Sequence, residues 1–237
     1  MAEIGDIEKF SAHSGVVFVN QTLLRTAFTH RSYLNENKSD ARTGEIYEHN
    51  ERLEFLGDAV LELVVTEFLF AKYPLKPEGE LTAIRAALVN TVSISEAAKS
   101  LHMNDFLLLS RGEARDNGRA RDVILANTYE SFLGALYIDQ GYIVSRDFIA
   151  RTLFGKLDAV VEQKLWQDPK SRFQEMAQEI HSITPTYRVL REQGPDHDKQ
   201  FVSGIFIGDT QIAEGVGKSK QEAETAAARK GLEAKGW

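Results

Sequence analysis

The segment at residues 49–65, HNERLEFLGDAVLELVV, places four carboxylates in a stretch otherwise suited to a buried helix. A buried carboxylate is costly unless it is ion-paired, hydrogen-bonded or bound to a metal. On an α-helix, Glu51, Glu54 and Asp58 share one face, because their spacing is i, i+3 and i+7. The segment therefore predicts a core helix that carries an acidic face.

Two interpretations of this acidic face follow from the pattern. Hard cations such as Mg²⁺ require clustered oxygen ligands, whereas most carboxylates on helices simply form a solvated stripe. A second site, Asn127 and Glu130 at i and i+3 in another apolar helix, modestly favours a metal site. Gly57 weakens the first helix unless another segment must approach its backbone closely.

Composition excludes several classes of protein. The chain has no cysteine, which rules out disulfides and thiolate-bound zinc and fits a reducing, cytoplasmic setting. The start, MAEIGDIEKF, lacks the features of a signal peptide, and the most apolar run, AVLELVVTEFLF, is too short for a membrane span. We therefore expect a cytoplasmic protein that is not inserted in a membrane. The net charge of −7 argues weakly against a nucleic-acid partner, so local clusters must support one.

The first part of the chain, from about residue 20 to 165, is predicted to be helical. Apolar residues recur at three- and four-residue spacing over 84–101 and again over 123–137, which predicts an amphipathic helix for each range. The segments 73–80 and 110–122 break the pattern with Pro, Gly and charged residues.

After Pro169 the pattern changes. A short helix, two alternating stretches, a third strand and an Ala-rich helix follow in order, which predicts a small α+β domain of αβββα type. We thus expect an all-α domain followed by a small α+β domain. The predicted boundaries are 1–162 for the all-α domain, 163–167 for the linker and 168–237 for the α+β domain.

Four ordered segments and a C-terminal domain together resemble the ribonuclease III family of double-stranded-RNA endonucleases. HNERLEFLGDAVL resembles the family's signature, and the C-terminal KSRFQE, GPDHDKQFVSGIFIG and GVGKSKQEAETAAA are similar to its double-stranded-RNA-binding domain. Three further segments match in order: AFTHRSYLNE at 27–36, GELTAIRAALVN at 79–90 and ILANTYESFLGALYID at 124–139. The resemblance covers nearly the whole chain from about residue 20.

The resemblance implies an endoribonuclease that hydrolyses double-stranded RNA with carboxylate-bound Mg²⁺, Mn²⁺ being a possible substitute. The products would be 5′-phosphate and 3′-hydroxyl ends with short 3′ overhangs. Asp58 and Glu130 would be catalytic, and Glu51 would support the site. The implied metal ligands are Glu54, Asp58, Asn127 and Glu130. Glu62 is expected to be solvated or locally paired.

The chain departs from the family at position 127, where many members have Asp and this chain has Asn127. An amide oxygen can still coordinate a cation, but one negative charge is lost. We expect an active enzyme that binds its cation more weakly. The alternative is a double-stranded-RNA-binding protein with weak or no cleavage, and a second rival is a metal-dependent hydrolase of nucleotides.

The resemblance also implies three contact regions for RNA and a homodimer. Apolar residues around Phe55 and Leu56 are compatible with a two-fold interface. The expected partners are ribosomal RNA precursors and structured transcripts, which the enzyme would process or turn over. The predicted RNA-binding residues are Gln174, Glu175, Pro195, His197, Lys218, Ser219 and Lys220.

Two other features have a structural interpretation beside a functional one. His30 in THRS is expected to be a structural histidine at a helix junction, since no partner for a nucleophilic triad is evident. The segment 110–122 carries four arginines, which could meet RNA phosphates, but its acidic residues make a solvated charged loop nearly as plausible.

Overall fold

The computed structural model describes residues 7, 9–11, 14–39, 44, 46–115, 118–162, 166–195 and 199–237. The chain divides into two compact units, Met1–Trp166 and Gln167–Trp237. Of the predicted linker, 163–165 lies outside the described residues. Within them, no helix is both long and apolar enough to cross a membrane.

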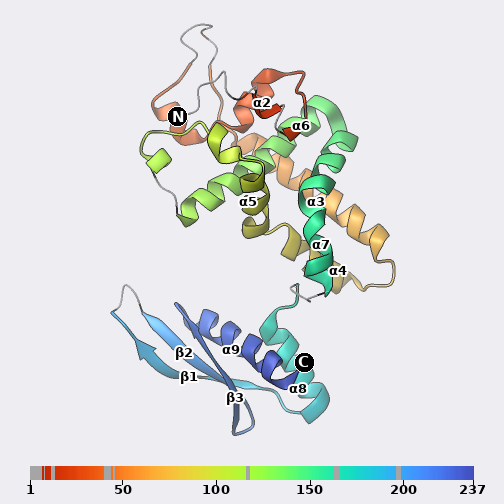
Figure 1. Cartoon of the computed structure of the whole chain (residues 1–237), viewed down its shortest axis with the longest axis vertical. Helices are drawn as coiled ribbons and strands as arrows, with labels where there is room; N and C mark the ends of the chain where they lie inside the picture. The colour runs from red at the N-terminus through yellow and green to blue at the C-terminus, as the bar shows by residue number, and fades with distance from the viewer. Residues whose placement is uncertain are drawn as a thin grey trace. The chain divides into compact units, whose positions relative to one another are not determined.

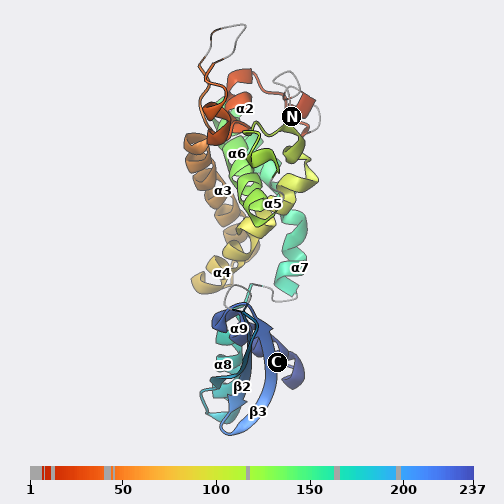
Figure 2. The same cartoon turned by 90° about the vertical axis from the view of Figure 1, so that its left-hand side faces the viewer.

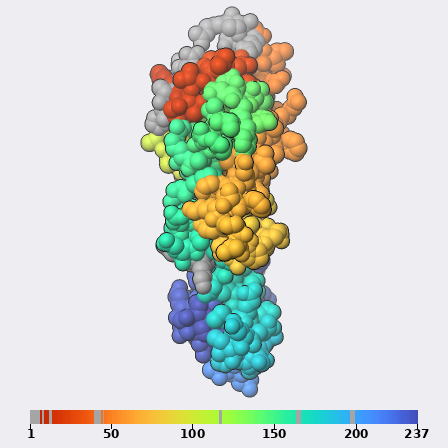
Figure 3. Space-filling view, turned by 90° about the vertical axis from the view of Figure 1, so that its right-hand side faces the viewer, coloured from red at the N-terminus to blue at the C-terminus, as the bar shows by residue number. Residues whose placement is uncertain are grey.

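The first unit is helical, as predicted, and its two longest helices are α3 and α6 (Figure 1). Figure 2 shows α6 between α3 and α5, and Figure 3 shows α3 and α4 beside the later part of α6 on one face of this unit. The α-helices are α2 (Gln21–Ala27), α3 (Glu51–Lys72), α4 (Glu78–Leu88), α5 (Thr91–Ser100), α6 (Arg119–Leu153) and α7 (Leu157–Glu162). The short 3₁₀ helices are η1 (Arg31–Asn35), η2 (Met103–Phe106), η3 (Glu113–Arg115) and η4 (Phe154–Lys156).

The core of the helical unit is built around aromatic rings of α6. Phe132 is fully buried, and its ring lies edge-on to Phe10 at 5.4 Å and tilted against Phe148 at 5.0 Å. Tyr129 is also fully buried, and its hydroxyl is 2.6 Å from that of Thr152. Large buried rings contribute more to burial than any other side chains, so α6 is fixed firmly in the middle of the unit.

The single helix predicted over 84–101 is wrong, because the structure has two helices there, α4 and α5. Asn90 separates them. Its side-chain oxygen accepts a hydrogen bond from the amide of Ser93 at 2.9 Å, while its amide group donates to the carbonyl of Ala87. Asn is a strong N-cap residue, so it starts a new helix where the apolar spacing alone predicted continuation.

The second unit has the predicted αβββα order. It consists of α8 (Pro169–His181), β1 (Thr186–Gln193), β2 (Gln200–Ile207), β3 (Thr210–Gly217) and α9 (Lys220–Lys235). The three strands form an antiparallel sheet in the order β1-β2-β3, with both helices on one face (Figure 1). Phe173 of α8, Ile205 of β2 and Ala227 of α9 meet in the small core.

Glycines let α9 lie directly on β3. A Cβ on Gly215 would stand 2.1 Å from the amide nitrogen of Ala227, and one on Gly217 would stand 2.5 Å from that of Ala223. Real Cβ atoms do not approach this closely, so both positions require glycine. The contact fixes where the first turn of α9 lies relative to the sheet.

Candidate metal and RNA-binding sites

The backbones of α3 and α6 touch where Gly57 faces Gly134. A Cβ on Gly57 would stand 1.7 Å from the carbonyl oxygen of Glu130, and one on Gly134 would stand 2.1 Å from that of Leu53. No other residue type fits either position without moving a helix backbone. The sequence left open whether another segment approaches Gly57 closely; in the structure the second acidic helix does.

Hydrogen bonds from Asn50 fix the start of α3. The Asn50 side chain donates to the carbonyl of Ala27 at 3.2 Å, and its own carbonyl accepts from the amide of Glu54 at 2.9 Å. The Ser131 hydroxyl of α6 donates to the carbonyls of Asn127 and Asn50, at 2.7 and 3.3 Å. Both acidic segments are therefore held by backbone contacts on either side of the glycine crossing.

Glu54 and Asp58 of α3 lie beside Asn127 and Glu130 of α6. Burial raises the pKa of Glu54, the charges of Glu51 and Asp58 raise it further, and a hydrogen bond from the Asn127 side chain lowers it. Burial, followed by the charges of Asp58 and Glu54, raises the pKa of Glu130 to about 8. The structure thus brings all four predicted ligand residues together, with their negative charges repelling one another.

The donor set fits a hard divalent cation. Three carboxylates and one amide supply only oxygen ligands, which suits Mg²⁺ or Mn²⁺. Among the residues that the structure describes, no three His, Cys, Asp or Glu side chains are already arranged to hold an ion. The carboxylates are therefore close neighbours rather than a finished cage, and a cation would offset the burial and the repulsion that raise the pKa values of Glu54 and Glu130.

Glu51 stands at the edge of this group. It is exposed, and its carboxylate lies 3.6 Å from Arg31 and 3.8 Å from the ring of His49. Its charge contributes to the raised pKa of Glu54. Glu62 is paired with Arg85 at 2.8 Å, which confirms that it is locally paired and lies apart from the four ligand residues.

His30 has the structural position that the sequence predicted. It caps η1, where its ring nitrogen Nδ1 is 2.8 Å from the hydroxyl of Ser32. Its own amide donates to the carbonyl of Leu108 at 3.1 Å, and burial lowers its pKa. The Ser32 hydroxyl also accepts a hydrogen bond from the amide of Ser110 at 3.1 Å. These contacts join the loop after α2 to the loop before α6, which is a structural role for His30.

The arginine-rich loop differs from the prediction at one of its four arginines. Arg121 belongs to α6, is buried, and donates from Nη2 to the carbonyl of Glu113 at 2.9 Å. It fastens the end of the loop and is not free to meet RNA. Residues 116 and 117 lie outside the described residues, and Arg111 and Arg115 before them are exposed.

In the second unit, the predicted RNA contacts lie on exposed surface. Gln174 and Glu175 are exposed on α8, and Pro195 is exposed after β1. His197 lies outside the described residues. Lys218 and Lys220 are exposed at the start of α9.

Ser219 has a structural task that the sequence interpretation missed. Its hydroxyl accepts a hydrogen bond from the amide of Glu222 at 3.1 Å, while the Glu222 carboxylate accepts from the amide of Lys218 at 2.8 Å. This is a variant of the capping box in which the carboxylate bonds the residue before the N-cap, and the Ser-x-x-Glu spacing could have revealed it. Two backbone amides at the start of α9 are thus already bonded and are not free to bind phosphate.

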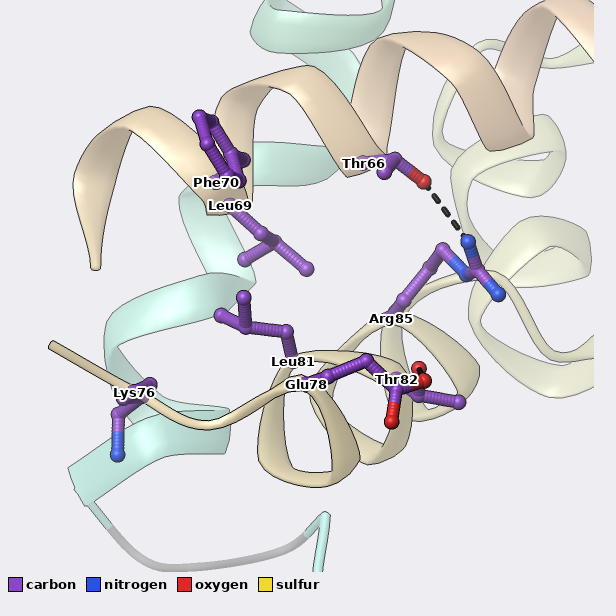
Figure 4. Close-up of a pocket in the computed structure, with 8 residues that line it drawn as sticks. All are labelled: Thr66, Leu69, Phe70, Lys76, Glu78, Leu81, Thr82 and Arg85. Atoms are coloured by element: carbon purple, nitrogen blue, oxygen red, sulfur yellow. Dashed lines mark hydrogen bonds between the residues drawn. The ribbon is translucent and has the colours of Figure 1, made fainter. Parts of the chain in front are cut away.

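Two hollows lie along α3. The larger, of about 720 Å³, is lined by residues that include Leu23, Leu56 and Ile138, and Phe55 beside it is 82% exposed. The smaller, of about 430 Å³, lies between α3 and α4 (Figure 4). There Arg85 donates to Thr66 at 2.8 Å and is paired with Glu62, and the apolar part of the lining comes from Leu69, Phe70 and Leu81.

Comparisons with known proteins match both units. A family model described as ribonuclease-III-like matches residues 20–157, and a double-stranded RNA binding motif matches residues 169–235. Ribonuclease 3 of Geobacillus thermodenitrificans is 44% identical over 219 residues, 92% of this chain and 87% of that protein. Ribonuclease 3 of Latilactobacillus sakei is 42% identical over 227 residues, 96% of each chain.

Solved structures match the helical unit. A nuclease domain of ribonuclease III from Campylobacter jejuni, described in terms of flexibility in a region involved in dimer formation, is 38% identical. It aligns with a TM-score of 0.54 over 62% of this chain and 94% of its own.

We predict that Gly57→Ala lowers the free energy of unfolding by at least about 2 kcal/mol, because the added methyl group must push α6 away from α3. Gly79→Ala in α4 is the matched control, since nothing lies within 4 Å of its Cβ and alanine favours helix. Chemical denaturation of both variants measures the difference. Equal stabilities would contradict the close crossing.

We predict that the metal-free protein loses stability as the pH rises from about 4.5 to 8. The unfolded chain ionises Glu130 above its ordinary pKa of 4.5, whereas the folded chain keeps that proton up to about pH 8. The contribution of Glu130 to the free energy of unfolding is therefore largest below pH 4.5 and is lost as the pH rises through 8. Chemical denaturation in chelator should show that the free energy of unfolding declines less with pH in Glu130→Gln than in wild type. An identical decline in both proteins would contradict the raised pKa of the buried Glu130 carboxyl.

Proposed function

This chain belongs to the ribonuclease III family, and from that premise we propose that it hydrolyses double-stranded RNA at a divalent-cation site between α3 and α6. It is an endonuclease of the ribonuclease III type, with a double-stranded-RNA-binding domain as its second unit. We assign residues 1–162 to cleavage, 163–167 to the connection and 168–237 to RNA binding. The observation that carries the proposal is the contact of Gly57 with Gly134, which places the two acidic groups side by side.

In the proposed site, Glu54, Asp58, Asn127 and Glu130 hold the cation. When bound, Mg²⁺, or Mn²⁺ in its place, would activate water and stabilise charge on the attacking and leaving oxygens of the phosphodiester. Asp58 and Glu130 are assigned the places nearest the reacting atoms by family resemblance, and after burial the charge of Asp58 is the main cause that raises the pKa of Glu130. Glu51 supports the site from its edge, where it also pairs with Arg31. The products are 5′-phosphate and 3′-hydroxyl ends with short 3′ overhangs.

The charge of the site depends on position 127. The hydrogen bond between the Asn127 side chain and Glu54 supports the assignment of Asn127 as a ligand. Asn127 contributes an oxygen without a negative charge. The proposed enzyme therefore binds its cation more weakly than a site with four carboxylates, and the rival function is RNA binding without efficient cleavage.

The proposed substrates are ribosomal RNA precursors and structured transcripts in the cytoplasm. Small domains of this kind span about 16 base pairs of A-form RNA through its shape, its phosphates and its 2′-hydroxyls. Gln174, Glu175, Pro195 and the segment from Lys218 to Lys220 lie on exposed surface suited to such contacts. His197 is assigned the loop contact by family resemblance.

We also propose that the protein acts as a homodimer, so that two sites cut the two strands. Phe55 is 82% exposed beside a hollow of about 720 Å³ lined partly by Leu23, Leu56 and Ile138. An exposed ring next to a hollow with an apolar part suits a self-complementary interface, in which each Phe55 enters the partner's hollow.

The first test is cleavage of a long RNA duplex by wild type, Asn127→Asp and Asp58→Asn, with Mg²⁺ and Mn²⁺ titrated. Asn127→Asp should reach half-maximal rate at a lower cation concentration, because it adds a charged ligand. Asp58→Asn should lose more than about 100-fold in rate, since loss of outer-shell partners alone costs 10–100-fold.

Asn104→Asp is the control, because it adds the same charge at an exposed position of η2. An equal change in cation requirement in Asn104→Asp would contradict the role of position 127. Cleavage by Asn127→Asp alone would favour the rival function of an RNA-binding protein. Full activity in Asp58→Asn would overturn the proposed site.

For the dimer, we expect Phe55→Glu to weaken self-association at least about 10-fold, because it places a charge in an apolar contact. Phe70→Glu is the matched control, since Phe70 is also on α3 and is 73% exposed. Sedimentation velocity over a concentration series compares the two variants. If Phe55→Glu and Phe70→Glu weaken the dimer equally, or if neither weakens it, an interface centred on Phe55 is contradicted.

A further inference from the structure

In the second unit, one carboxylate is shared by two lysines. Glu192 lies near the end of β1 and pairs in register with Phe201 of β2. Its Oε2 is 2.9 Å from Nζ of Lys199, and its Oε1 is 3.8 Å from Nζ of Lys220. Among the residues that the structure describes, no other carboxylate pairs with two lysines.

The Phe201 ring also contacts both lysines of this cluster of Glu192, Lys199 and Lys220. The ammonium groups of Lys199 and Lys220 lie 5.7 and 5.9 Å from the centre of the Phe201 ring, within range of a cation–π contact. The hydrogen bond from Lys199, followed by the charges of Lys199 and Lys220, lowers the pKa of Glu192. Glu192 therefore stays ionised at neutral pH and faces both cations at once.

We propose that Glu192 is an internal counter-ion that limits how tightly the second unit holds RNA phosphate. The inference rests on the proposed function, because it concerns the lysines at the start of α9 that are assigned to RNA. Lys220 is the first residue of α9, and Lys199 immediately precedes β2, so the carboxylate joins the end of the β1–β2 connection to that helix.

Counter-ion release gives the physical reason. A lysine that meets phosphate gains affinity mainly by releasing the ions condensed on the nucleic acid, which makes binding steeply salt-dependent. Lys199 and Lys220 must give up or share Glu192 before they can neutralise a phosphate. A carboxylate that stays in place also repels the incoming phosphate. Both effects weaken binding and flatten its dependence on salt.

Lys218 supplies an internal comparison. It is exposed at the same end of α9, and its backbone amide is bonded to Glu222, but its side chain has no ion pair with Glu192. Its contribution to RNA binding should therefore be insensitive to Glu192. Glu192 should lower RNA affinity only by its ion pairs with Lys199 and Lys220.

The test measures binding of the full chain to an RNA duplex of about 20 base pairs, in chelator so that the RNA is not cut. Glu192→Gln should bind about 3–10-fold tighter near 0.1 M salt, and its plot of log affinity against log salt should be steeper by about one unit. Glu214→Gln is the matched control. It removes the same charge, but Glu214 pairs with Arg191 and lies on the sheet face opposite α9, because Gly215 next to it faces that helix.

A variant background tests the route of the effect. In Lys199→Gln/Lys220→Gln, adding Glu192→Gln should change affinity by less than about 2-fold, because no paired lysine remains to be freed. An undiminished gain in that background would overturn the inference, as would equal gains in Glu192→Gln and Glu214→Gln. If wild type binds RNA and Glu192→Gln has the same affinity and salt slope, the inference about Glu192 is overturned but the proposed RNA-binding function is not. Failure of every protein to bind would overturn the proposed RNA-binding function as well.

Discussion

The contact between Gly57 and Gly134 is the constraint on which the helical unit depends. The backbones of α3 and α6 meet there with no room for a Cβ on either helix. Side chains that flank such a crossing cannot avoid one another, and Glu54, Asp58 and Glu130 are among them. Burial of α6 through Phe132 and Tyr129 supplies the favourable free energy that holds these carboxylates together against their mutual repulsion.

This repulsion links the fold to the proposed chemistry. A carboxyl whose pKa is raised to about 8 ionises at a cost in free energy until a cation binds. The same residues that weaken the metal-free fold would therefore form the strongest contacts of the metal-bound state. Asn127 reduces both the repulsion in the metal-free fold and the strength of cation binding, because its amide hydrogen-bonds Glu54 but adds no charge.

Local signals in the sequence predicted most elements, and pairings between distant segments were harder to predict. Alternation predicts two of the three strands, and Gly57 is compatible with a close approach, but no local pattern marks Gly134 as its partner. The cap at Asn90 was missed because apolar spacing continues through it. Glu192 and Lys220 are far apart in sequence, and only strand register together with the packing of α9 on Gly215 brings them into contact.

The most direct test of the central claim is an anomalous diffraction map from crystals of the protein grown with Mn²⁺. The helix crossing predicts a manganese peak within coordination distance of oxygen atoms from both helices, from Glu54 or Asp58 on α3 and from Glu130 on α6. A peak bound by one helix alone, or no peak at this crossing while the ion binds elsewhere, would contradict it.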